Sequence, residues 1–231
     1  MNVELFPRNR TVPADGAVHV PDWLGPEQQR ELVAACREWA SPPAGMRTVR
    51  TPGGGTMTAQ QVCLGWHWYP HGYARTVVDG DNAPVKRLPR WLGDLARKAV
   101  EEAYGGDPCP ARYDIALINF YGAEARMGMH RDSDERSDDP VVSISLGDSC
   151  VFRFGNTESR GRPYHDVDLR SGDLFVFGGA SRLAYHGVPR VRPGTAPPAL
   201  GLSGRLNITL RVSGFTGSAT NPLPATDGGS G

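Results

Sequence analysis

The second half of the chain carries a series of short runs rich in β-branched and aromatic residues, each bounded by glycine or proline. The runs recur at a spacing of roughly ten residues, and they are Asp114–Tyr121, Val141–Leu146, Val151–Phe154, Val167–Leu169, Leu174–Phe177 and Leu206–Val212. Many short strands at even spacing are typical of a sandwich, a barrel or a jelly roll. The sequence therefore predicts a mainly β core in this half.

The first half has two helical patterns that flank a segment rich in glycine and aromatic residues. Pro26–Ala40 carries an apolar stripe behind a proline that suits the first helical position, and Pro89–Ala103 carries a second stripe. Residues 43–85 combine a glycine run with the aromatic cluster Trp66–Tyr73, which favours hairpins and loops over a packed helix. Residues 1–24 are expected to form an irregular arm with short extended pieces.

These patterns predict one integrated domain in three parts. Residues 1–112 form an N-terminal extension with the two helices, and residues 113–216 form the β core. Residues 217–231 are rich in glycine, proline, serine and threonine, and we expect them to be disordered.

The composition is that of an ordinary globular protein. The 231 residues include 39% hydrophobic residues, and 25 basic residues balance 25 acidic ones. No apolar run approaches the roughly 18 residues of a membrane span, and the first residues lack a secretion pattern, so we expect a cytoplasmic protein and a monomer. The cysteines are scattered, which indicates buried, reduced thiols; they are Cys36, Cys63, Cys109 and Cys150.

A single H-x-D triplet, His130 to Asp132, is followed 54 residues later by His186. Two imidazoles and one carboxylate form the facial triad that binds non-haem Fe(II) and leaves coordination positions open. Alternate residues of a strand point to the same face, so His130 and Asp132 can converge on one ion if a strand carries both. An isolated triplet of this kind in a charged loop is more often a solvated surface feature than a metal site. Whether this one indicates a metal site depends on the residues further along the chain.

Downstream of the triplet lies a strand pattern with strict alternation, Arg205–Arg211. The polar residues Arg205, Asn207, Thr209 and Arg211 fall on one face, and the intervening residues are apolar. The polar face is either wet surface or the wall of a cavity, in which guanidinium groups would clamp a carboxylate. On an earlier strand pattern, Asn119 and Tyr121 share one face and are candidates for the same cavity.

Taken together, these residues resemble the AlkB family of Fe(II)- and 2-oxoglutarate-dependent dioxygenases, over most of residues 20–215. The resemblance rests on an ordered set of segments: Thr51–Gly54, Met57, Leu64–Trp66, Asn119–Tyr121, His130–Asp134, Val142–Gly147, Phe152–Gly155, Gly172–Asp173, Gly178–Gly187 and Arg205–Arg211. The order of the set is more specific than any one member. It implies a double-stranded β-helix, or jelly roll, with flanking N-terminal helices.

The resemblance also implies the roles of the polar residues around the triad. Fe(II) would be held by His130, Asp132 and His186. Arg205 would pair with the distal carboxylate of 2-oxoglutarate, and the cosubstrate site would be completed by Asn119, Tyr121, Asn207 and Arg211.

On the substrate side, residues 43–85 match the family's nucleotide-recognition lid. Asp134 matches the residue that reads the exocyclic amine of the target base, and Trp66 and Tyr73 match contacts that the lid makes to the nucleotide. Arg160 is a weaker match to a substrate-contacting arginine, because the loop of residues 155–171 carries an insertion.

The implied activity is direct-reversal repair of N-alkylated bases in DNA, of the 1-methyladenine and 3-methylcytosine type. Decarboxylation of 2-oxoglutarate with O2 would be coupled to hydroxylation of the methyl group and release of formaldehyde. The expected partner is single-stranded or locally flipped alkylated DNA. Between residues 42 and 98, eight basic side chains stand against three aspartates, a net charge of +5 that suits a phosphate backbone.

Three alternatives remain open from the sequence. The same chemistry can act on RNA or tRNA, since nothing in the chain marks a contact to the 2′-hydroxyl. A hydroxylase of a small molecule or a protein shares the iron core and differs in the lid. A non-enzymatic cupin-like module would use the triad as a structural metal site.

Overall fold

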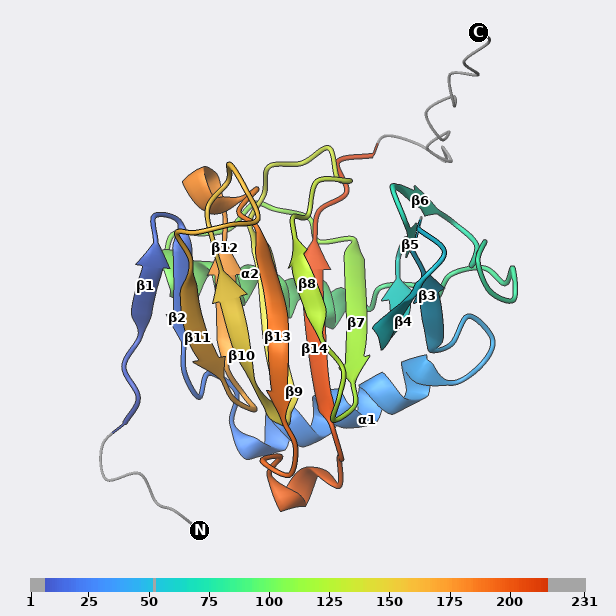
Figure 1. Cartoon of the computed structure of the whole chain (residues 1–231), viewed down its shortest axis with the longest axis horizontal. Helices are drawn as coiled ribbons and strands as arrows, with labels where there is room; N and C mark the ends of the chain where they lie inside the picture. The colour runs from blue at the N-terminus through green and yellow to red at the C-terminus, as the bar shows by residue number, and fades with distance from the viewer. Residues whose placement is uncertain (1–6, 52, 216–231) are drawn as a thin grey trace, which may run out of the picture.

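Two antiparallel β-sheets lie face to face in the computed structural model of the chain (Figure 1), which describes residues 7–51 and 53–215. The larger sheet has eight strands, in the order β1 (Thr11–Ala14), β2 (Ala17–Val20), β12 (Leu174–Phe177), β9 (Val141–Gly147), β14 (Arg205–Arg211), β7 (Ile115–Tyr121), β4 (Thr56–Leu64) and β3 (Arg47–Arg50). The smaller sheet has four, in the order β11 (His165–Leu169), β10 (Ser149–Phe154), β13 (His186–Arg192) and β8 (Met127–His130). The predicted mainly β fold, with two facing sheets as a jelly roll requires, is confirmed.

The helices α1 (Pro26–Ala40) and α2 (Arg90–Tyr104) cover the outer face of the larger sheet, behind it in Figure 1. Both lie within one residue of the ranges expected from the sequence. Pro26 occupies the start of α1, and the side chain of Gln28 accepts a hydrogen bond from the amide of Gly25, which closes the first turn. Each helix buries one apolar stripe against the sheet.

Strand β14 is the central strand that the alternation pattern predicted. Its apolar residues Leu206, Ile208 and Leu210 join the core between the sheet and the helices. Its polar residues therefore face the smaller sheet, and all seven residues of the strand are buried. The polar face is not a wet surface: it lines the interior between the two sheets.

The segment predicted as hairpins and loops forms β3, β4 and a separate two-stranded hairpin, β5 (His67–Tyr69) with β6 (Gly72–Ala74). Within the segment 43–85 that was expected to form the nucleotide-recognition lid, this hairpin lies in residues 65–85, and from here on the word lid means these residues alone. At its root, Gly65 has a left-handed φ of +79°, and a Cβ there would lie 1.9 Å from the carbonyl oxygen of Asp114. Only glycine permits this close approach.

The expected N-terminal arm is more ordered than predicted in residues 7–24, because β1 and β2 extend the larger sheet beside β12. Short 3-10 turns at Gly179–Ser181 and Pro198–Leu200 precede β13 and β14. The expected disordered tail lies outside the described residues. Within the described ranges, no helix is long and apolar enough to cross a membrane.

Candidate metal and cosubstrate site

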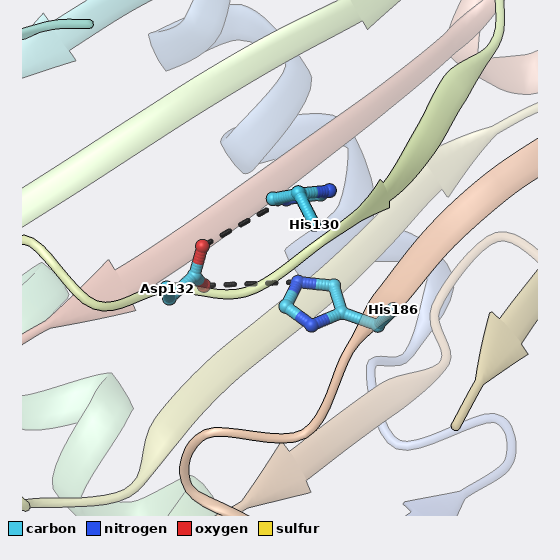
Figure 2. Close-up of side chains that lie close together, drawn as sticks. All are labelled: His130, Asp132 and His186. Atoms are coloured by element: carbon cyan, nitrogen blue, oxygen red, sulfur yellow. Dashed lines mark ion pairs between the residues drawn. The ribbon is translucent and has the colours of Figure 1, made fainter. Parts of the chain in front are cut away.

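The three expected metal ligands meet between the sheets (Figure 2). His130 ends β8, His186 begins β13, and the two residues are directly paired across the smaller sheet. Asp132 lies just beyond the end of β8, so the expectation that one strand carries both His130 and Asp132 is wrong: the chain leaves the strand after His130, and the side chain of Asp132 still points toward the two histidines. One ligand atom from each residue lies within 4.8 Å of the other two.

The histidine rings are oriented so that each presents the same nitrogen to the centre. Nδ1 of His130 lies 3.0 Å from the carbonyl oxygen of Gly128, and Nδ1 of His186 lies 3.0 Å from that of Ala184. A carbonyl oxygen only accepts, so each Nδ1 donates its proton and each Nε2 is the ring nitrogen that faces the other ligands. Both Nε2 atoms lie 3.8 Å from the carboxylate of Asp132.

The charge states suit metal ligation. Burial, reinforced by the neighbouring His130, lowers the pKa of His186 to about 4, so this ring is neutral at pH 7. Burial by itself raises the pKa of Asp132, but the guanidinium of Arg211 and the two imidazoles lower it to about 2. The carboxylate is thus ionised, and among the described residues its Oδ2 has no hydrogen-bond partner although it is buried.

Arg211 lies at the end of β14 nearest Asp132 and belongs to a buried ionic cluster. Its Nη2 lies 2.7 Å from Asp132, and its Nη1 donates to Glu135 at 2.9 Å. The hydroxyl of Tyr73 also donates to Glu135, and Arg182 binds the other oxygen of this carboxylate at 3.1 Å. Arg211 therefore orients the carboxylate of Asp132, an expected metal ligand, and links it to the lid through Tyr73.

Arg205 lies six residues earlier on the same face of β14 and is only 1% exposed. Its Nη2 donates to Ser145 at 3.2 Å, whereas Nε and Nη1 have no hydrogen-bond partner among the described residues. A buried cation with unsatisfied donors is costly unless a ligand pairs with it. Both Arg205 and Arg211 line the same interior cavity as His130 and His186.

The other expected cosubstrate residues also line this cavity. Asn119 accepts a hydrogen bond from Gln61, and Asn207 donates to the hydroxyl of Ser143. The hydroxyl of Tyr121 lies 3.6 Å from the sulfur of Met127. The structure thus brings together all eight residues expected for metal and cosubstrate. The orphaned Asp132 oxygen and the orphaned Arg205 donors fit a divalent metal and a dicarboxylate.

The two lid residues expected to touch the substrate, Trp66 and Tyr73, are both buried, and neither lines the cavity. Trp66 is 1% exposed, its indole donates to Asp114 at 3.2 Å, and the guanidinium of Arg75 lies 3.4 Å from its ring centre. It is not part of the cavity lining. Trp68, two residues on, donates from its indole to Asp134 at 2.8 Å.

Arg160 lies exposed in the loop that follows β10, apart from the cavity. Two further residues were not singled out in the sequence, Glu135 and Arg182. Glu135 stands among several acidic residues of one loop, and only its direct succession to Asp134 hinted at a role. Arg182 lies within the Gly178–Gly187 segment but carries no pattern of its own.

Comparisons with known proteins agree with this geometry. A family model described as the 2OG-Fe(II) oxygenase superfamily matches residues 16–211. The DNA N(6)-methyladenine demethylase ALKBH1D of Arabidopsis thaliana is 34% identical over 235 residues, which cover 90% of this chain and 52% of that protein. The alpha-ketoglutarate-dependent dioxygenase AlkB of Escherichia coli (strain K12) is 37% identical over 173 residues, which cover 73% of this chain and 77% of that protein.

The solved structure of OsALKBH1 matches with a TM-score of 0.78 and 31% identity, covering 88% of this chain and 100% of that one. The chain spans about half the length of the plant relative ALKBH1D. The superfamily's description names Fe(II) and 2-oxoglutarate, and O2 is the co-reactant of an oxygenase, which agrees with the cofactors expected from the sequence. The chain therefore belongs to the 2OG-Fe(II) oxygenase superfamily and, within it, to the AlkB family.

Proposed function

We propose that this protein is a DNA oxidative demethylase that reverses N-alkylation of bases, of the 1-methyladenine and 3-methylcytosine type. The observation that carries the proposal is one cavity holding both a His-Asp-His triad and a buried arginine with unsatisfied donors. The names of the two relatives, a DNA demethylase and AlkB, support the nucleic-acid substrate.

In this proposal, His130, Asp132 and His186 hold Fe(II), and Arg205 pairs with the distal carboxylate of 2-oxoglutarate at the other end of the cavity. Bound together, the metal and cosubstrate supply oxidative decarboxylation with O2 and hydroxylation of the methyl group, whose product releases formaldehyde. Arg211 keeps the Asp132 carboxylate oriented and ionised. Burial of the cavity between the two sheets limits access of bulk water to the reacting centre.

The substrate base is recognised at the lid. Asp134 accepts a hydrogen bond from the exocyclic amine of the base, and the indole of Trp68 fixes the orientation of that carboxylate. Trp66 and Tyr73 support the lid from beneath, through Asp114 and Glu135. Because the damaged base must reach a cavity between two sheets, the enzyme acts on single strands or on a flipped base.

The test is release of formaldehyde from a single-stranded oligodeoxynucleotide carrying 1-methyladenine or 3-methylcytosine, with Fe(II), 2-oxoglutarate and O2. We expect release in the wild type and none in Asp132→Ala, which lacks one metal ligand. If succinate forms without formaldehyde from any methylated base, the iron chemistry stands and the assigned substrate is wrong.

A parallel RNA oligonucleotide with the same methylated base separates the two nucleic-acid substrates. The proposal expects a higher kcat/KM on DNA. The reverse ranking would assign the same chemistry to RNA.

A further inference from the structure

A cleft of about 670 Å³ opens outside the iron cavity, at the N-terminal end of α2. Its walls are Gly65 and Arg75 of the lid, the segment that leads into α2, and Arg112–Asp114 just before β7. It shares no lining residue with the iron cavity. The activity proposed above gives this cleft no role.

The lining of the cleft is strongly basic. Two aspartates, Asp94 and Asp114, face five arginines, which leaves a net charge of +3; the arginines are Arg75, Arg87, Arg90, Arg97 and Arg112. Asp114 already accepts hydrogen bonds from Trp66 and Ser213, and Asp94 is paired with Arg97 at 2.7 Å. The acidic groups are therefore occupied, and the positive charge of the cleft is left uncompensated.

Three of the arginines are exposed and unengaged. Within residues 7–51 and 53–215, the side chains of Arg87, Arg90 and Arg112 have no hydrogen bond, ion pair or ring contact. Arg75 is instead held in place, because its guanidinium stacks on Trp66 and donates to the carbonyl oxygen of Gly65 at 2.8 Å. The cleft thus combines one fixed guanidinium with three that are available to a ligand.

The position of these charges on α2 is electrostatically unfavourable for the protein alone. Arg90 is the first residue of α2, the cap residue Pro89 makes no side-chain cap, and the first turn contains no acid. The N-terminal end of a helix is positive, so cations there destabilise it and anions stabilise it. The comparable turn of α1 contains Glu27, as the dipole favours. An anionic partner bound at this end of α2 would interact favourably with both the helix dipole and the arginines, and would offset their mutual repulsion.

The cleft lies beside the Arg211 end of β14, the end at which the iron cavity approaches Asp132. The amide of Asp114, in the cleft wall, donates to the carbonyl oxygen of Arg211 at 3.2 Å. The side chain of Arg211 reaches Asp132 on the other side of the strand. The root of the lid borders the cleft, since Gly65 lines the cleft and leads directly into the lid.

We propose that this arginine cleft binds backbone phosphates of the substrate nucleic acid, on the stretch of strand that flanks the base in the iron cavity. The identity of the partner rests on the proposed demethylase function. Guanidinium groups pair bidentately with phosphate oxygens, and the free amides at the start of α2 add donors of the same kind. A strand held at both places is anchored on either side of the lid.

The first experiment measures the affinity for an unmodified, fluorescein-labelled single-stranded oligodeoxynucleotide by anisotropy across a range of salt concentrations. Each phosphate contact contributes a slope of about −0.7 in log K against log salt for single strands, so Arg87→Gln/Arg112→Gln should reduce the slope by about 1.4. The matched control is Arg30→Gln/Arg190→Gln, which removes the same charge from exposed positions on α1 and β13. The proposal is overturned if the slope of log K against log salt falls equally in both double variants, or if it does not fall in the cleft variant.

Arg90→Gln tests the proposal by its separate effects on binding and on thermal stability. If the cleft serves a ligand, this variant binds the oligonucleotide more weakly but has an unchanged or higher Tm, because a cation leaves the positive end of α2. A lower Tm with unchanged binding would show that Arg90 serves the fold, and would count against the proposal.

A third experiment, the dependence of KM on oligonucleotide length, distinguishes failure of this proposal from failure of the proposed function. We expect KM for methylated oligonucleotides to fall in the wild type as the strand is lengthened, and this dependence on length to be lost in the cleft variant. If formaldehyde is released but the length dependence is the same in both, the function stands and the cleft assignment fails. If no oligonucleotide releases formaldehyde, the demethylase function fails, and the salt slopes still decide the cleft.

Discussion

The side chain of Arg205 is buried with most of its hydrogen-bond donors unpaired. It lies between the sheets with one hydrogen bond, to Ser145, and two guanidinium nitrogens that no described residue satisfies. A buried, unpaired cation costs several kcal/mol in a protein, on the order of what a buried ion pair loses when one partner is removed. In the proposed function, the distal carboxylate of 2-oxoglutarate would offset that cost on binding.

Arg205→Lys is expected to raise KM for 2-oxoglutarate by roughly 10- to 100-fold, since the lost second hydrogen bond to a charged group is worth about 1.5–3 kcal/mol. Initial rates of succinate formation over a range of 2-oxoglutarate concentrations measure the effect. Arg153→Lys, on the surface of β10, is the control and should leave KM as it is. An unchanged KM in Arg205→Lys would remove Arg205 from the cosubstrate site.

Trp68→Phe keeps the aromatic ring of the lid and removes the donor to Asp134. We expect kcat/KM for a methylated oligonucleotide to fall by roughly tenfold, the lower end of the range for a hydrogen bond to a charged group, mainly through KM. The control is Trp91→Phe, an exposed tryptophan on α2. A larger loss from Trp66→Phe than from Trp68→Phe would return the direct base contact to Trp66, as the sequence suggested.

At the scale of single residues, the sequence predicted the positions of the metal and cosubstrate residues more successfully than those of the lid residues. The residue types of His130, Asp132 and His186 suit one metal, and the alternation of β14 drew attention to Arg205, but their roles were implied by the resemblance to the AlkB family. Glu135 was not predicted, because its burial depends on Arg182 and Arg211, which lie 47 and 76 residues away. The substrate roles of Trp66, Tyr73, Asp134 and Arg160 stay predictions.

Among the elements, the N-terminal arm is fastened to the core through one carboxylate at the start of β12. Asp173 is fully buried and accepts hydrogen bonds from Arg8 at 2.8 Å, from the amide of Asp22 at 3.0 Å and from the amide of Arg170 at 2.9 Å; its other neighbour, Nε2 of His19, lies 3.0 Å away. This contact holds β2 beside β12 and thereby completes one edge of the larger sheet. The sequence predicted the strand β12 but not this role of the residue before it.

The pH dependence of stability is tied to that carboxylate. Burial alone would raise the pKa of Asp173, but hydrogen bonds from His19 and Arg8 lower it to about 2 from an ordinary value of 3.8. A lowered folded-state pKa stabilises the protein above about pH 4 by about 2 kcal/mol, and this contribution disappears as the pH falls toward 2.

Asp173→Asn should therefore lower the free energy of unfolding at pH 7 by at least that amount, because the variant also leaves Arg8 with a weaker acceptor. Urea denaturation at pH 7 and at pH 3 measures the difference, which should narrow at the lower pH. Asp166→Asn, which breaks the exposed pair with Arg153, should cost under about 1 kcal/mol at either pH. If Asp173→Asn lowers the free energy of unfolding by the same amount at pH 7 and at pH 3, the pH dependence does not come from the Asp173 carboxylate.

For the elements as a group, periodicity predicted both helices within one residue and most strands of the β core. Sheet order was not visible, because it depends on pairing between strands far apart in the chain. β14 pairs with β7 on one side and β9 on the other, and neither neighbour is adjacent to it in sequence. The exit of the chain from β8 before Asp132 was likewise invisible, since alternation says nothing about where a strand ends.

At the scale of the whole molecule, the cavity exists because β14 turns its polar face toward the smaller sheet. Residues from both sheets converge on it: Arg205 and Arg211 from the larger, His130 and His186 from the smaller. Any ligand that pairs with these groups therefore links the two sheets. Binding and global stability should be coupled.

This coupling predicts separable steps in thermal stability. Mn²⁺, which suits the same carboxylate and imidazole ligands without turnover, should raise Tm, and 2-oxoglutarate should raise it further. At a hundred times its Kd, a ligand adds about 2.7 kcal/mol, or roughly 5–10 °C for a domain of this size. Arg205→Gln should keep the step due to Mn²⁺ and lose most of the step due to 2-oxoglutarate, whereas Asp132→Ala should lose the first step and with it most of the second. Equal steps for 2-oxoglutarate in the wild type and Arg205→Gln, measured by differential scanning calorimetry, would show that the cosubstrate does not bridge the two sheets through this arginine.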